Sequence, residues 1–140
     1  MIRPLLAAGL YLIGNIGVAC DLAEGDLAGA DLAGYNMIEL ESGVTLHYRI
    51  EPSPLRVAQH FSMQFRTCRG EQSLKPDSFK VDALMPKHGH GMNYKADIDI
   101  QRDGMVEATG MLFHMPGQWQ IKVDLSYDGL ARQVKIDYQI

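Results

Sequence analysis

Apolar and polar side chains alternate along most of the chain after residue 43, which is the period of a β-strand with one buried face. The first run covers residues 44–50 and ends before Pro52, and it places His47 on the outward, solvent-facing side. The second run covers residues 60–66 and places His60 outward in the same way. Similar runs cover residues 79–85, 94–100, 106–112, 119–125 and 134–138. The pattern predicts about seven strands and no long amphipathic helix.

Two Asp-Gly pairs lie between consecutive runs, and Asp-Gly is a strong signal for a tight β-hairpin. Asp103-Gly104 separates residues 94–100, whose inward side begins at Tyr94, from residues 106–112. Asp128-Gly129 separates the last two runs. About seven short strands with regular turn signals predict an all-β fold, an immunoglobulin-like or cupredoxin-like antiparallel β-sandwich.

The N-terminal residues differ from the rest of the chain. Arg3 precedes an apolar stretch over residues 4–18 that is too short and too rich in glycine for a comfortable membrane span. This pattern predicts an export signal over residues 1–19 with cleavage near Ala19, and therefore a periplasmic or cell-envelope protein. A retained, short N-terminal anchor is the alternative.

Residues 20–36 are expected to form a flexible tether, because they repeat Asp-Leu-Ala three times, too few copies to stack into a solenoid. The sandwich domain is then expected over residues 37–140. Cys20 follows Gly17-Val18-Ala19, which partly resembles a bacterial lipobox, although Leu is usual where Gly17 stands. Lipidation of Cys20 would anchor the domain to a membrane surface.

The second cysteine, Cys68, falls in a predicted strand. A bridge between Cys20 and Cys68 is the less favoured alternative, because Cys20 lies in the leader or tether. Cys68 is therefore expected to be a lone thiol that packs as a small buried hydrophobe.

Composition and charge narrow the possible functions. A chain of 140 residues with 46% hydrophobic and 21% charged residues is typical of one globular domain. The net charge of −4 and the scattered basic residues exclude the concentrated basic face that nucleic-acid binding needs. No nucleophile and base stand at a useful spacing, so we expect no enzymatic activity.

Methionine and histidine concentrate in one part of the chain. Five of the eight methionines and three of the five histidines lie between residues 85 and 115. The first group is the segment MPKHGHGM at residues 85–92, and the second is HMPG at residues 114–117. Thioether and imidazole ligands suit soft or borderline metals, and in an exported protein this mixture indicates copper before zinc or calcium.

The expected copper ligands fall into two ranks. His88, His90 and Met92 are the primary candidates, because the two histidines are one residue apart and would face the same side of an extended loop. Additional candidates are Met85, His114 and Met115. Two of them have a structural alternative: Met85 continues the inward face of its strand, and His114 suits a half-buried histidine that fixes a loop.

The two Met/His segments also resemble a known family. Residues 85–92 and the later segment GMLFHMPGQW at residues 110–119 resemble the loop and strand motifs of the YtkA-like domain family, which is related to FixH-type proteins. The resemblance implies a β-sandwich in an exported or membrane-anchored bacterial protein, with links to copper supply and cytochrome oxidase assembly. Unlike FixH-type proteins, the chain is expected to have no transmembrane anchor.

The sequence therefore predicts a periplasmic copper carrier that hands its metal to an unidentified envelope protein. The alternative is a metal-free interaction or structural module, in which the Met-Pro turns and Trp119 pack a corner of the sandwich. The side chains of His88 and His90 discriminate between the two. Together in solvent they favour the carrier, and tied into hydrogen bonds within the loop they favour the module.

Overall fold

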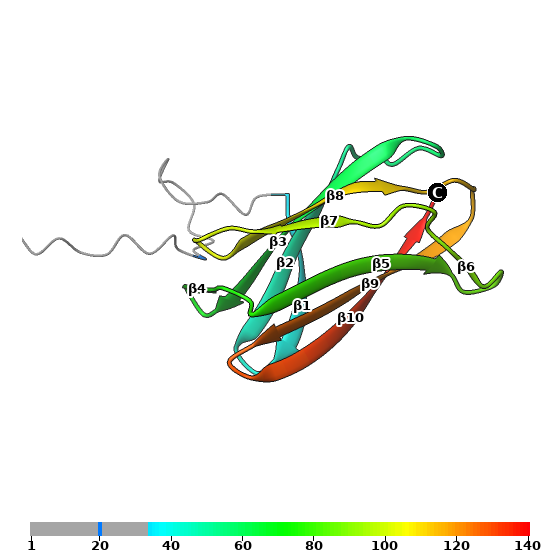
Figure 1. The fold of residues 1–140 in the computed structure, drawn as a ribbon. Coiled ribbons are helices and arrows are strands. Elements are labelled where there is room, and N and C mark those ends of the chain that lie inside the picture. The colour runs from blue at the N-terminus through cyan, green and yellow to red at the C-terminus, as the bar shows by residue number, and fades with distance from the viewer. Residues whose placement is uncertain (1–19, 21–33) are drawn as a thin grey trace, which may run out of the picture.

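The computed structural model describes Cys20 and residues 34–140, which form two antiparallel β-sheets packed face to face (Figure 1). The first sheet contains β1 (Asn36–Glu41), β2 (Val44–Glu51), β3 (His60–Arg69), β4 (Gln72–Leu74), β7 (Asp97–Ile100) and β8 (Met105–Leu112). The second contains β5 (Ser78–Met85), β6 (His90–Gly91), β9 (Gln118–Tyr127) and β10 (Leu130–Gln139). The predicted export signal, residues 1–19, and most of the predicted tether, residues 21–33, lie outside the described part.

The strand order is that of an immunoglobulin-like sandwich. One sheet runs β2-β3-β8-β7 and the other runs β10-β9-β5, which matches the four-strand and three-strand sheets of that fold. Strands β1, β4 and β6 are additions to this pattern. The predicted β-sandwich is therefore confirmed. Within the described residues, no helix is long and apolar enough to cross a membrane.

The core lies between the inner faces of the two sheets, as the alternation predicts. Strand β9 buries every second side chain from Trp119 to Tyr127. The Trp119 ring stacks on Phe113, with centroids 4.4 Å apart, and Phe65 packs on Phe79 at 4.9 Å. Each buried aromatic or aliphatic side chain of this kind stabilises the fold by about 1.5–3 kcal/mol.

Both predicted Asp-Gly hairpins are present. Asp128 and Gly129 have φ angles of 51° and 73°, which are the two positive values of a type I′ turn, and Tyr127 pairs directly with Leu130. Asp103-Gly104 ends a four-residue connection in which the Gly104 N–H donates to the Gln101 carbonyl. Tyr94, expected to face inward, is exposed instead because β7 begins only at Asp97.

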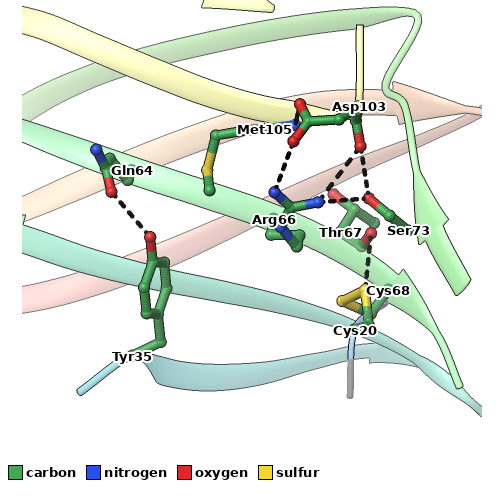
Figure 2. Close-up of polar contacts among 9 residues, drawn as sticks. All are labelled: Cys20, Tyr35, Gln64, Arg66, Thr67, Cys68, Ser73, Asp103 and Met105. Carbon is green, nitrogen blue, oxygen red and sulfur yellow. Dashed lines mark hydrogen bonds and ion pairs between the residues drawn. A yellow bond between two sulfur atoms is a disulfide. The ribbon is translucent and has the colours of Figure 1, made fainter. Parts of the chain in front are cut away.

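The structure joins Cys20 to Cys68 in a disulfide, with Cα atoms 5.9 Å apart (Figure 2). The Cys20 N–H also donates to the Glu71 carbonyl at 2.8 Å, and both cysteines are buried. The expectation of a lone thiol at Cys68 is therefore wrong. The bond also contradicts lipidation of Cys20, because the same sulfur has no free valence for a thioether-linked lipid.

Polar side chains on the outer face of the first sheet form a second buried group. Arg66, only 1% exposed, donates to the Ser73 hydroxyl and pairs with the Asp103 carboxylate at 3.0 Å (Figure 2). His47, which pairs with Arg66 across the strands, is 4% exposed and hydrogen-bonds Thr45, so its predicted solvent exposure is wrong. Burial lowers the pKa of His47 and favours its neutral form.

Burial raises the pKa of Asp103, but hydrogen bonds from the Met105 N–H and from Arg66, together with the Arg66 charge, outweigh it. The pKa of Asp103 therefore lies below its ordinary value. A carboxylate of this kind contributes stability above its unfolded pKa, about 3.9, and loses the contribution as the pH falls through the folded-state pKa.

The disulfide closes a loop with a sequence separation of 48 residues. Because closing a loop of that length removes chain entropy from the unfolded state, replacing both cysteines by serine is expected to lower the free energy of unfolding by about 4 kcal/mol. Urea denaturation of the oxidised protein, the reduced protein and the double variant measures the difference. Identical midpoints for all three would show that the bond does not contribute.

Replacing Asp103 by Asn is expected to lower the free energy of unfolding at neutral pH by about 2–3 kcal/mol, because Arg66 keeps a buried charge without its counterion. The variant also loses the part of the acid sensitivity that Asp103 supplies below about pH 4. Urea denaturation at several pH values tests both effects. Asp99→Asn, a change at an exposed strand position, is the control. Equal stability of wild type and Asp103→Asn at pH 7 would contradict the account of this ion pair.

Candidate metal centre

Three connections meet at one end of the sandwich because their flanking strands run antiparallel. They are the β2–β3 loop at residues 52–59, the β5–β7 connection at residues 86–96, which contains β6, and the β8–β9 loop at residues 113–117. We call these three segments the His/Met rim. It forms the right-hand end of the molecule in Figure 1, where the C-terminus and β6 lie.

Direct contacts hold the rim together. The Ala58 N–H donates to the Phe113 carbonyl, which joins the first and third connections. The rings of His60 and Tyr94 pack edge to face at 5.3 Å, which joins the start of β3 to the second connection. The rim is therefore one continuous surface.

The two Met/His segments of the sequence meet at this rim. Strands β5 and β9 pair in a register that puts Leu84 opposite Gln120, so β5 ends where β9 begins. A Cβ added to Gly117 would lie 2.8 Å from the terminal methyl of Met85. The chain folds in this way because Gly117 has a φ of 132°, which an L side chain rarely adopts, and has no side chain to displace Met85.

The MPKHGHGM segment makes a tight reversal at the end of β5. The N–H groups of His88 and Gly89 both donate to the Met85 carbonyl, and Gly89 has a φ of 66°. The chain then returns as β6, where His90 pairs with Met85, and the Met92 N–H donates to the Ala83 carbonyl at 3.0 Å. This reversal brings both histidines to the outside of the turn.

His88 and His90 lie together in solvent. Both are exposed, and their ring centroids are 6.4 Å apart with an interplanar angle of 29°. Among residues 34–140, no side-chain hydrogen bond ties either ring to the loop. Since a metal–imidazole bond is about 2.0 Å long, side-chain rotation is enough to bring one nitrogen of each ring onto a shared ion.

The methionines of the rim are less exposed than the histidines. Met85 is 1% exposed and belongs to the core, so the structural alternative describes it better than the expected ligand role. Met92 and Met115 are half-buried and pack against the core. Of the three, Met92 lies nearest in sequence to the histidine pair and is half-open to solvent.

His114 does not join His88 and His90 in a cluster that could hold a metal. Its ring packs edge to face on Trp119 at 5.5 Å, and its buried Nδ1 has no hydrogen-bond partner among the described residues. The Trp119 indole N–H donates to the Met115 carbonyl at 3.0 Å and fixes the turn. The sequence marks Trp119 only as a packing residue, and its position directly after HMPGQ is the signal for this second role.

The chemistry of the rim restricts the ions that it can hold. Within the part of the chain that the structure describes, no three His, Cys, Asp or Glu side chains cluster tightly enough to hold a metal. The thioether of Met92, two residues after His90, is the candidate for a third side-chain ligand beside His88 and His90. Such a donor set favours a soft ion of low coordination number over Zn²⁺, Ca²⁺ or Mg²⁺.

The burial of Met85 and the exposure of His88 and His90 predict different effects on stability when each residue is replaced. Met85→Ala is expected to lower the free energy of unfolding by about 2–5 kcal/mol, because it leaves a cavity in the core beside Gly117. His88→Ala and His90→Ala are expected to change it by less than about 0.5 kcal/mol, because both side chains are exposed and unbonded. Urea denaturation of the metal-free variants measures these effects. Equal losses for all three variants would contradict the division into core and surface.

No protein-family model and no curated protein matches the sequence. The fold is similar to that of a DUF4426 family protein from Pseudomonas aeruginosa PAO1, with a TM-score of 0.58 and 8% sequence identity. The match covers 77% of this chain and 95% of that protein. At this identity the likeness shows a shared β-sandwich fold. The specific resemblance to the YtkA-like family stays a prediction.

Proposed function

We propose that this protein is an exported copper-binding carrier that uses the His/Met rim and is related to the YtkA-like proteins. The observation that carries the proposal is the exposed pair of His88 and His90 beside Met92. No carboxylate lies in residues 85–92 or 113–117, so the segments supply only nitrogen and sulfur donors. Copper in its reduced state is the ion that suits two imidazoles and one thioether.

The exposure of the pair favours transfer over storage or catalysis. An ion held by two solvent-facing imidazoles is open to attack by ligands from another protein, so it can leave by ligand exchange. A resident catalytic ion would require more enclosing ligands and second-shell hydrogen bonds to its histidines. Because His88 and His90 have no such bonds among the described residues, a labile site is the better description.

The disulfide supports the export part of the proposal. Disulfide bonds persist in oxidising compartments such as the bacterial periplasm and are rare in the cytosol. Cleavage after Ala19 would leave Cys20 and its bond to Cys68 in the mature protein. We therefore propose a periplasmic location, and we place no lipid on Cys20.

A metal-free structural or interaction module remains the second candidate, and one specific observation favours it. Met85 lies in the core, and Met92 and Met115 pack against it. Methionines in these positions contribute packing whether or not a metal is bound. Under this alternative the rim would bind a protein, for example during assembly of a respiratory oxidase, without holding copper.

Anaerobic titration with Cu(I) against a competing chelator tests the proposal. We expect one equivalent to bind with sub-nanomolar affinity, and the triple change of His88, His90 and Met92 to Ala to weaken binding by roughly 100-fold or more, because loss of ligands costs at least as much as loss of their supporting partners. His60→Ala, which removes an exposed histidine outside the segment, is the control. Binding by the triple variant as tight as by wild type would favour the module.

A further inference from the structure

The His/Met rim carries positive charge, although the chain as a whole is acidic. Its basic residues are Arg56, Lys87 and Lys95, all exposed, and its three segments contain no Asp or Glu. The protein has a net charge of −4. The carboxylates that border the rim are those of Glu51 and Asp97 at strand ends and the terminal carboxylate of Ile140, and Glu51 is paired with Arg49 at 3.3 Å.

The loops at the opposite end of the sandwich do not have this excess of positive charge. The acidic residues there are Glu71, Asp77, Asp103 and Asp128, and the basic residues are Lys75 and Arg102. Arg66 and Arg69 of β3 pair with Asp103 and Asp128 at this end. Among the loops, the excess of positive charge is therefore found at the end that holds the candidate metal site. A field of this kind steers association with a partner of opposite charge.

The same rim exposes two of the four large hydrophobic residues that are exposed on the described part of the protein. Tyr94 is 49% exposed and Val57 is 40% exposed. Tyr94 is held in place by the edge of the His60 ring. Tyr and Arg are enriched among the residues that dominate the energy of protein interfaces, so Tyr94 and Arg56 provide anchors between the charged positions.

We propose that the rim is a docking surface for a protein that presents carboxylates around its own soft-metal site. The metal-exchange part of this inference rests on the proposed function. Arg56, Lys87 and Lys95 draw an acidic surface onto the rim, and Val57 and Tyr94 exclude water at the contact. Docking in this orientation puts His88 and His90 against the partner, where a bound ion passes from their imidazoles to the partner's ligands without a change of oxidation state.

Copper transfer to two chelators of the same chemical class, one charged and one uncharged, tests the electrostatic part of the proposal. Bathocuproine disulfonate is an anion, and neocuproine is uncharged. The Lys87→Glu/Lys95→Glu variant is expected to transfer copper to the anionic chelator roughly 5- to 10-fold more slowly than wild type at low salt, and equally fast at high salt. Transfer to neocuproine is expected to be the same for both proteins.

Lys75→Glu/Lys80→Glu is the matched control, because it makes the same change in net charge at exposed positions outside the rim. It is expected to behave as wild type. Equal rates for wild type and the rim variant with the anionic chelator would overturn the proposal. So would equal slowing by the control variant, because net charge alone would then explain the effect.

A metal-free measurement keeps the docking surface separate from the copper site. The isotope-labelled protein without copper is titrated with an acetylated peptide of alternating Glu and Gly, and amide shifts are followed by nuclear magnetic resonance. Shifts concentrated at residues 56–57, 87 and 94–95 would support docking even if copper did not bind. Shifts spread over both ends would overturn it. A third outcome is that wild type sediments with phosphatidylglycerol vesicles, the rim variant does not, and the peptide shifts no amide signals. This outcome would assign the rim to a membrane and would also overturn the proposal.

Discussion

The antiparallel pairing of β5 with β9 is the constraint on which the candidate site depends. A slip of one residue would turn Trp119, Ile121 and Val123 from the core to solvent, so burial of these side chains holds the register. That register ends β5 beside the start of β9 and brings Met85 against Gly117. Both Met/His segments therefore meet because a hydrophobic core, and not a metal, aligns their strands.

The opposite end of the sandwich is held by covalent and ionic bonds. Cys20 is joined to Cys68 in β3, and two residues earlier on the same strand Arg66 is paired with Asp103 of the β7–β8 turn. Each of these links ties β3 to a segment far away in sequence. These links fix the end of the sandwich that lies opposite the His/Met rim.

Within the rim, structural and functional demands are divided between residue types. Methionines and Trp119 pack in or against the core and build the support, whereas His88, His90 and the basic side chains face solvent. An exposed imidazole pair on a rigid support is suited to ligand exchange, and the surrounding positive charge is suited to recruiting an acidic partner. The proposed carrier role and the proposed docking surface therefore depend on the same three loops.

The sequence by itself determined the elements that depend on local period. Alternating side chains predicted the β-sandwich strands, and the Asp-Gly pairs predicted two hairpins. The same alternation placed Met85 on the inward face of its strand, which gave the core alternative for this residue. Strands β1, β4 and β6 were not predicted. Strands β4 and β6 are short, and the local sequence pattern does not show which strand each of the three pairs with.

Only the tertiary structure decided which distant residues meet. Three features depend on segments that lie far apart in the sequence, and a local pattern does not show that these segments meet. They are the bond between Cys20 and Cys68, the burial of His47 and Arg66, and the contact of Met85 with Gly117. The physical reason is that alternation specifies which face of a strand is apolar, whereas strand order and register specify what lies against that face.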